Sequence, residues 1–252
     1  MTSEARQQEI LRRVLGQRQV RVKELAAEYG VHEMTIRRDL DLLADSGHIQ
    51  RIHGGARLGE RTSEELSYQL RSTQNKSAKE SIARAALGLI EEGDTIALDA
   101  STTSLALARM LGGRDVRAIV TGLDAAEALA AVGIPFVLAG GAFHPPARSF
   151  VGAFVKSTLE RLNADKAFFS AKGYIPESGF SDPHLPEVEV KAALLRGGGT
   201  VVALLDASKF GRRSLARIAS TDEVDIVVTD CHPGQTYEEE FSRQDVRLIV
   251  AD

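Results

Sequence analysis

The sequence predicts an α/β protein in which a small helical domain precedes a larger domain built on a mostly parallel sheet. From about residue 76 onward, short apolar runs alternate with helical segments, a pattern typical of a parallel sheet covered by helices on both faces. The first 57 residues instead carry three short helical segments and a glycine pair. We therefore expect domains over residues 1–57 and 76–252, joined by a polar linker over residues 58–75.

Composition excludes several classes of protein. The 252 residues are 43% apolar and 26% charged, as in an ordinary soluble protein. With one cysteine, Cys231, and no Cys/His cluster of zinc-finger spacing, we expect no internal disulfide, no metal and no cofactor. Residues 1–8 are polar and charged, and no apolar stretch is long enough to span a bilayer. We expect a cytoplasmic protein without a membrane partner.

Charge is unevenly distributed along the chain. The formal net charge is −4, but residues 1–57 carry a net charge of +2 and residues 58–252 one of −6. A polyanionic partner would meet the N-terminal part. Many solvated faces carry as much charge, so this signal alone does not choose between a DNA-binding and an ordinary surface.

Helical spacing predicts three helices in the N-terminal domain, over Ala5–Gly16, Val22–Tyr29 and Glu33–Ser46. Ile36, Leu40 and Leu43 form one apolar stripe on the third helix, and Gly47 ends it. The alternation over residues 48–53, followed by a glycine pair, predicts a short β-wing that ends in a turn.

Three residues give the second and third helices the spacing of a helix-turn-helix. Ala26 is small enough for the two helices to approach closely, Gly30 permits a left-handed turn, and Ile36 fills the shared core. This motif is demanding, because each position requires a particular kind of residue.

Residues on the outer half of the third helix suit contact with DNA. With Ile36 pointing inward and about 100° per residue, Met34, Arg37 and Arg38 point away from the core. Arginines there would reach guanine acceptors or phosphates in the major groove of double-stranded DNA, and Arg51 and His53 on the wing would reach the flanking backbone. The alternative is a protein-interaction module with a solvated arginine face.

The pattern after residue 76 predicts seven strands and five helices. The strands are expected over Thr95–Asp99, Ala118–Thr121, Phe136–Ala139, Ala167–Ser170, Val201–Asp206, Ile226–Asp230 and Arg247–Val250. The helices are expected over Ala78–Glu91, Ser104–Leu111, Ala125–Val132, Val151–Leu162 and Glu187–Arg196.

Two strands of this domain are followed by similar polar turns. Asp99-Ala100-Ser101-Thr102-Thr103 leads into a helix, whose free amides and hydroxyls would accept a phosphate. Asp206-Ala207-Ser208 precedes Lys209, a counter-charge for the phosphate, while the two aspartates would accept sugar hydroxyls. Because carboxyl ends of parallel strands line a common crevice, we expect one pocket. The alternative is that Ser and Thr only cap the helix, and that each Asp caps a turn.

The chain resembles the DeoR family of bacterial regulators in Thr35-Ile36-Arg37-Arg38-Asp39-Leu40 and in Arg51-Ile52-His53-Gly54-Gly55-Ala56. The resemblance implies that Thr35, Arg37 and Arg38 face DNA and that the His53-Gly54-Gly55 turn closes the wing. One position departs from the family: His32 stands where Ser usually caps the recognition helix. We expect either a phosphate contact or, more simply, a tolerated surface histidine there.

The resemblance continues through the second domain, whose fold in that family is similar to that of ribose-5-phosphate isomerases. It implies that an effector pocket is bordered by Asp99, Ser101, Thr102, Thr103, Gly140, Gly141, Glu187, Lys191, Asp206 and Lys209. Lys172 is a further candidate because it follows another strand, although an exposed turn lysine is the plainer interpretation. Ser101 and Thr121-Gly122 replace the family's commoner Gly and Thr-Asn, so the ligand of a relative does not transfer.

These patterns predict a transcriptional repressor of a carbohydrate or polyol catabolism operon, controlled by a phosphorylated sugar or related metabolite. Because a repressor ordinarily reads two half-sites of its operator, we expect a symmetric homodimer or homotetramer. The alternative is a sugar-phosphate isomerase or transferase with an added DNA-binding domain. The sequence shows no nucleophile beside a base, so we expect no enzymatic activity.

Overall fold

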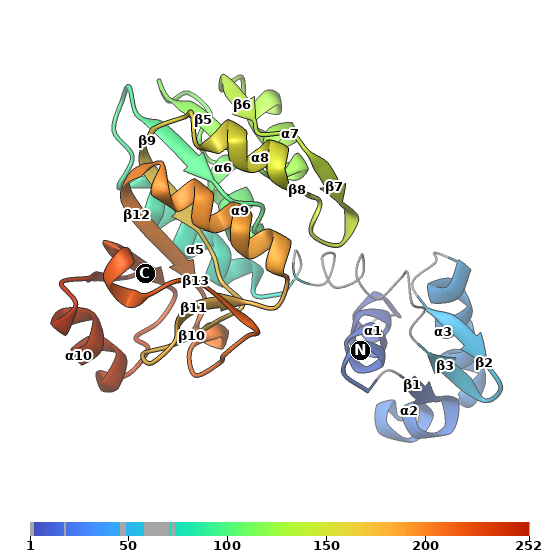
Figure 1. Cartoon of the computed structure of the whole chain (residues 1–252). Helices are drawn as coiled ribbons and strands as arrows, with labels where there is room; N and C mark the ends of the chain where they lie inside the picture. The colour runs from blue at the N-terminus through green and yellow to red at the C-terminus, as the bar shows by residue number, and fades with distance from the viewer. Residues whose placement is uncertain (1–2, 18, 46–48, 58–70, 72–73, 252) are drawn as a thin grey trace. The chain divides into compact units, whose positions relative to one another are not determined.

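The computed structural model describes residues 3–17, 19–45, 49–57, 71 and 74–251. The chain divides into two compact units, residues 1–74 and 75–252, which are considered separately below (Figure 1). The expected positions of Gly47 and His48, and most of the expected linker, lie outside the described residues, so the extent of the linker stays a prediction. In the described part of the chain, no helix is long and apolar enough to cross a membrane.

Three helices form the N-terminal unit, and they match the expected segments closely: α1 (Ser3–Gln17), α2 (Val22–Tyr29) and α3 (Glu33–Asp45). Gly30 ends α2 with φ 62°, the left-handed turn that the motif requires. Ile36 and Leu40 are fully buried, and together with Ile10, Val14 and Leu25 they form the core of the unit.

The wing is larger than the sequence predicts. Besides β2 (Gln50–Ile52), it contains β1 (Gln19–Arg21) and β3 (Gly55–Arg57), in the antiparallel order β1-β3-β2. Gly55 was expected in a turn but begins β3, where a Cβ atom would lie 2.0 Å from the Val20 carbonyl oxygen. Strands of three residues carry too little alternation to be recognised, which is why β1 and β3 were missed.

The C-terminal unit is built on a seven-stranded sheet in which all neighbouring strands are parallel. Its order is β15-β14-β12-β9-β4-β5-β6. The strands are β4 (Thr95–Leu98), β5 (Arg117–Val120), β6 (Phe136–Leu138), β9 (Ala164–Phe169), β12 (Gly198–Leu205), β14 (Ile226–Thr229) and β15 (Arg247–Val250). The predicted mostly parallel α/β architecture is therefore confirmed.

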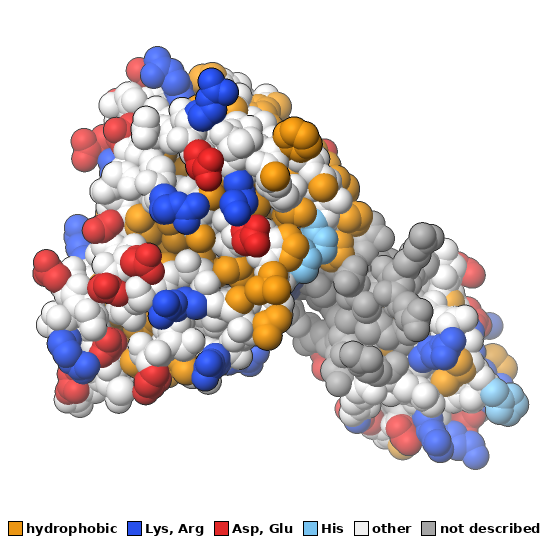
Figure 2. Space-filling view, viewed as in Figure 1, with side chains coloured by type: hydrophobic (Ala, Val, Ile, Leu, Met, Phe, Trp, Pro, Cys, Tyr) orange, Lys and Arg blue, Asp and Glu red, His pale blue; other side chains and the backbone are white. Residues whose placement is uncertain are grey.

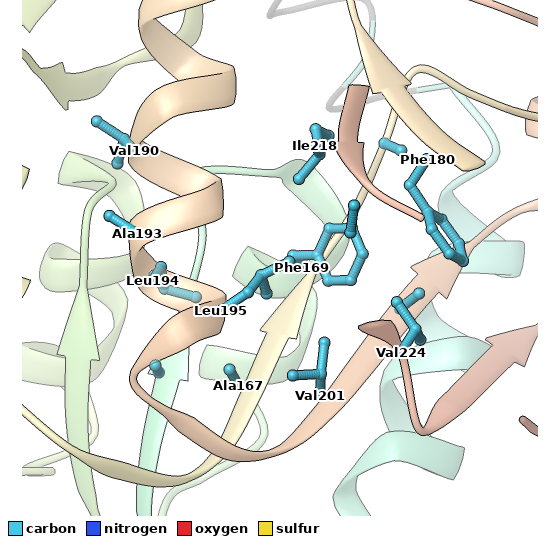
Figure 3. Packing of buried hydrophobic residues seen from close by; sticks show 14 of the residues in the cluster. Ala167, Phe169, Phe180, Val190, Ala193, Leu194, Leu195, Val201, Ile218 and Val224 are labelled. Atoms are coloured by element: carbon cyan, nitrogen blue, oxygen red, sulfur yellow. The ribbon is translucent and has the colours of Figure 1, made fainter. Parts of the chain in front are cut away.

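Alternation along the strands divides the core between the two faces of the sheet. On β12, Val201, Ala203 and Leu205 join one buried cluster, whereas Val202 and Leu204 join the other. The first cluster is covered by α8 (Ala153–Leu159) and α9 (Leu185–Arg196), and the second by α5 (Lys76–Leu87), α6 (Thr102–Ala108) and α7 (Leu123–Ala131). Figure 3 shows Leu194 and Leu195 of α9 near Ala167 and Phe169 of β9. Helices thus cover both faces, as expected.

Several elements have no counterpart in the sequence prediction. They are the hairpin of β7 (Ala142–His144) and β8 (Ser149–Val151), the antiparallel sheet of β10 (Gly173–Ile175), β11 (Gly179–Asp182) and β13 (Ala216–Ala219), helix α10 (Gln235–Arg243), and the short 3-10 turns η1 (Pro145–Ala147), η2 (Ala207–Lys209) and η3 (Thr221–Glu223). The strands are too short to show alternation. Helix α10 places Tyr237 and Phe241 four residues apart in a polar segment, a helical signal that the sequence prediction did not use.

Candidate functional site

The exposed face of α3 carries the arginines expected to face DNA. Met34 is 51% exposed, and Arg37 and Arg38 are exposed, while Thr35 is half-buried at the edge of the face. Arg37 Nη2 lies 3.2 Å from Glu33 Oε2, so this arginine already has a partner one turn earlier. Arg38 has no hydrogen bond or ion pair with any described residue. Of the two, Arg38 is the arginine whose donors are available to a ligand.

A groove open to solvent runs between α3 and the wing. Its lining includes Arg21, Lys23, Arg37 and His53. His53 is exposed at the turn between β2 and β3. The groove therefore brings together the wing histidine and a recognition-helix arginine, and it adds Arg21 and Lys23, which the sequence reasoning did not select.

Two further residues expected at the DNA surface are engaged within the unit. The His32 ring accepts the Met34 backbone N–H at 3.2 Å through Nδ1, so the histidine acts as a helix cap in place of the family's usual serine. Arg51 donates from Nε to Asp41 at 2.8 Å and from Nη1 to the Gly55 carbonyl at 2.7 Å. Arg51 thus ties the wing to α3.

In the C-terminal unit, the expected polar residues lie at the carboxyl edge of the sheet. The predicted strands end one residue too late at each of six positions, which lie directly after the strand ends: Asp99, Thr121, Ala139, Ser170, Asp206 and Asp230. Because β4, β9 and β12 are adjacent, Asp99, Ser170 and Asp206 follow three neighbouring strands.

Asp99 is fully buried and accepts hydrogen bonds from several groups. Its Oδ1 accepts the Ser104 hydroxyl at 2.6 Å and the Ser101 amide at 3.1 Å, and its Oδ2 accepts the Ser170 amide at 3.1 Å. The carboxylate therefore joins the end of β4 to the start of α6 and to the end of β9. These donors occupy it from within the unit, which favours the turn-capping interpretation over direct binding of a sugar hydroxyl.

Lys191 on α9 is buried at the centre of this polar network. Its Nζ lies 3.3 Å from Asp99 Oδ2 and 3.3 Å from Asp182 Oδ2, and it donates to the Ser170 carbonyl at 2.8 Å. Burial alone would lower the pKa of Lys191, but attraction to Asp182, Asp99 and Glu187 raises it above its ordinary value. Burial would raise the pKa of Asp182, and Lys191 lowers it below its usual range. Two carboxylates already neutralise this lysine.

The turn that precedes α6 contains two half-buried hydroxyl residues, Ser101 and Thr102, of which Ser101 is engaged as a helix cap. Ser101 caps the helix, because its Oγ accepts the Ser104 amide at 3.1 Å. Thr103 is 3% exposed, whereas Thr102 is half-buried. Thr102 is therefore the residue of this turn whose side chain is better placed to meet a ligand.

Asp206 and Lys209 form a second cluster, after β12. Lys209 Nζ lies 3.6 Å from Asp206 Oδ2, and Asp206 Oδ1 accepts the Asn75 amide group at 3.1 Å. Burial would raise the pKa of Asp206, but the hydrogen bond from the Ser208 hydroxyl and the charge of Lys209 lower it below its usual range. Among the described residues, no hydrogen bond or ion pair joins Lys209 to the Ser101–Thr103 turn.

The β7–β8 hairpin contacts the start of α9. Ser149 of β8 donates a hydrogen bond to buried Glu187, and the rings of His144 and His184 stack with centroids 3.9 Å apart. Gly140 and Gly141, which follow β6, lead into this hairpin and are exposed. Lys172 is half-buried after β9, and its amide donates to the Ser181 carbonyl at 2.9 Å.

Sequence reasoning missed several residues of these networks: Asp182, Ser149, Ser104, Ser170 and Asn75. Asp182 and Ser149 lie on short strands, and Ser170 and Asn75 lie just outside regular elements, so no periodic signal marks them. Ser104 lies in the first turn of α6, and its spacing in the sequence does not reveal its bond to Asp99. No cluster of three or more metal-ligating side chains occurs within the part of the chain that the structure describes. On the face of the C-terminal unit drawn in Figure 2, acidic and basic side chains are interspersed, an arrangement that does not favour a polyanion over other partners.

Comparison with known proteins matches both units to one family. Residues 6–62 match the DeoR-like helix-turn-helix domain, and residues 74–231 match the DeoR C terminal sensor domain. The HTH-type transcriptional regulator GolR of Listeria innocua is 33% identical over 249 residues, covering 98% of each chain. The HTH-type transcriptional repressor GlcR of Bacillus subtilis is 34% identical over 219 residues, covering 86% of this chain and 84% of that one.

Among solved structures, ribose 5-phosphate isomerase A of Methanocaldococcus jannaschii aligns with 54% of this chain and 55% of its own, with a TM-score of 0.42 and 21% identity. Both family models and the full-length relatives agree with the motifs in the recognition helix and the wing. The chain therefore belongs to the DeoR family of transcriptional regulators.

Proposed function

We propose that this chain is a repressor that binds operator DNA through α3 and the wing and that is controlled by a phosphorylated sugar or related acid bound at the carboxyl edge of the sheet. The regulated genes would encode carbohydrate or polyol catabolism. The observation that carries the proposal is the exposed pair Arg37 and Arg38, opposite a fully buried stripe on a helix that belongs to a family of regulators.

The DNA-binding part of the proposal is supported by how the two arginines are presented. Arg38 is exposed and has no partner among the residues that the structure describes, and Arg37 lines the groove beside the wing. Such an arrangement suits bidentate contact with guanine in the major groove. Thr35 and Met34 flank the arginines on the same helix, and His32 and Arg51 would act mainly by holding the helix and the wing in place.

The effector part rests on the carboxyl edge of the parallel sheet, where ligands of open α/β sheets usually bind. Lys191 is buried between two carboxylates. The half-buried lysines Lys209 and Lys172 would supply the cation for a ligand phosphate, with Thr102 as a hydroxyl donor. Asp99, Ser101, Thr103 and Glu187 would support the pocket through the hydrogen bonds described above, and Gly140 and Gly141 would border it.

If Thr102 and Lys209 hold the effector, replacing either residue should give a repressor that no longer responds to the effector. Thr102→Ala and Lys209→Ala should each weaken binding of a phosphorylated effector by about 1.5–3 kcal/mol, because each removes one charge-assisted hydrogen bond. Thermal shift with a panel of phosphorylated sugars, polyols and their acids would identify the effector, since a ligand selective for the folded state raises its stability.

The matched control is Lys156→Ala, which removes a lysine from the exposed ion pair with Glu189 on the same unit. Wild-type affinity in both Thr102→Ala and Lys209→Ala would contradict the assignment. Incubating the wild type with pentose and hexose phosphates tests the enzymatic alternative, because turnover would show a reaction that a regulator does not need.

We further propose that the repressor acts in the cytoplasm as a homodimer or homotetramer, because one winged module offers only a small footprint on DNA. Sedimentation of the whole chain at micromolar concentration measures this directly. A monomer under those conditions would contradict it.

A further inference from the structure

One carboxylate of the recognition helix faces away from the proposed DNA surface and has no role in the function proposed above. Asp39 is 2% exposed, and three side chains of α1 donate to it. Arg6 Nε lies 2.5 Å from Oδ2, Gln7 Nε2 lies 3.0 Å from Oδ1, and Ser3 Oγ lies 3.2 Å from Oδ1. All three donors come from the first five residues of α1.

Asp39 lies at the edge of the apolar stripe of α3. At about 100° per residue, Asp39 is about 60° from Ile36 around the helix, while Arg38 is about 160° from it. Apolar contacts are non-directional and fix which face is buried, whereas hydrogen bonds restrict distance and angle. Three bonds to one carboxylate therefore restrict the rotation and the axial position of α3 in addition to the restraint that packing provides.

The negative charge of Asp39 does not oppose DNA binding at this position. An exposed carboxylate beside Arg38 would repel DNA phosphates, but here the carboxylate is buried against an arginine that is itself only 8% exposed. Burial alone would raise the pKa of Asp39, and the hydrogen bonds from Arg6 and Gln7 lower it below its usual range. The carboxylate stays ionised and bonded at neutral pH without adding negative charge to the DNA-binding face.

We propose that Asp39, held by Arg6, Gln7 and Ser3, is a positioning residue for operator recognition: it orients α3 so that Arg37 and Arg38 meet the base edges. The proposal rests on the proposed function, operator binding by α3. It assigns to the start of α1 a part in sequence specificity without contact with DNA.

The competing explanation is that the ion pair only stabilises the fold. The double variant Arg6→Met/Asp39→Leu distinguishes between the two explanations. Removing one partner of a buried pair leaves an unpaired charge, whereas replacing both by apolar residues of similar size is often neutral or favourable for stability. We therefore expect the double variant to keep the fold while it removes the directional bonds.

The experiment uses the full chain and two duplexes of equal length. One duplex is selected by the wild type from a random-sequence library, and the other is its scrambled counterpart. We expect the double variant to melt within a few degrees of the wild type, to lose at least about tenfold affinity for the selected duplex, and to lose less than about threefold for the scrambled one. Asp45→Asn removes an exposed carboxylate from the same helix and should change neither affinity.

A double variant that discriminates between the duplexes as well as the wild type does would overturn the proposal. If that variant does not fold, Gln7→Ala decides, because it removes one donor and leaves the ion pair intact. Reduced discrimination by Gln7→Ala supports the positioning role, and wild-type discrimination overturns it. Failure of the wild type itself to enrich any duplex would instead contradict the proposed function.

Discussion

Replacing Lys191 with methionine should lower the free energy of unfolding of the C-terminal unit by about 3–5 kcal/mol, because removal of one partner leaves buried charge without compensation. Asp99 is 0% exposed and Asp182 is 3% exposed, and both contact Lys191 Nζ. Hydrogen exchange of the amides in β4 and β9, measured in the whole chain, reports the stability of the C-terminal unit separately from that of the N-terminal unit.

The control for this prediction is Lys156→Met, which removes the same charge from an ion pair that is largely exposed. Such pairs contribute about 0–1 kcal/mol, so this variant should remain close to the wild type. A loss of less than about 1 kcal/mol in Lys191→Met would show that the network does not hold the edge of the sheet together.

The pH dependence of the wild type follows from the two shifted pKa values. The lowered pKa of Asp182 adds stability that is complete above the unfolded pKa, about 3.9, and is lost as the pH falls through the folded value. The raised pKa of Lys191 adds stability that is complete below the unfolded pKa, about 10.4, and is lost as the pH rises through the folded value. In Lys191→Met, acid should reduce the deficit, because protonating Asp182 removes one of the unpaired charges.

Much of the fold was predictable because apolar runs mark the buried strands and helical spacing of apolar residues marks the helices. The inner strands of the parallel sheet are rich in buried Val, Ile, Leu, Ala and Phe, whereas the edge strands β6 and β15 are apolar but partly exposed. The helices between the strands have one apolar side. Six strand ends were placed one residue late, and at five of them the residue wrongly included is polar, as at Asp99 and Asp206. Three of these residues, Asp99, Ser170 and Asp206, follow the neighbouring strands β4, β9 and β12, so the error falls at the candidate site.

The parts that could not be predicted depend on contacts between distant residues. Asp182 lies on a four-residue strand of a second sheet, and only the tertiary structure brings it to Lys191. Glu187 and Lys191 were named from family resemblance, but their partners Ser149 and Asp99 come from other elements. Local sequence gives the kind of residue, whereas the partner decides whether a charge is free to bind a ligand.

Among the substitutions in the N-terminal unit, Arg38→Ala should have a large effect on operator binding. We expect a loss of about 1–3 kcal/mol where the side chain reads a base, with a smaller dependence on sequence if it contacts phosphate. Stability should change by less than about 0.5 kcal/mol, because the side chain is exposed and has no partner among the described residues. Fluorescence anisotropy with a selected duplex measures the affinity.

Arg37→Ala tests whether an arginine that already has a protein partner contributes less to operator binding than Arg38 does. Arg37 must exchange its bond to Glu33 for DNA, so its net contribution should be smaller than that of Arg38. Arg114→Ala removes an arginine that pairs with Glu92 in the C-terminal unit, and it should leave the affinity unchanged. Because each phosphate contact releases counterions, a variant that loses one should also show a shallower dependence of affinity on salt. Wild-type affinity in both Arg37→Ala and Arg38→Ala would show that another face of the unit binds the operator.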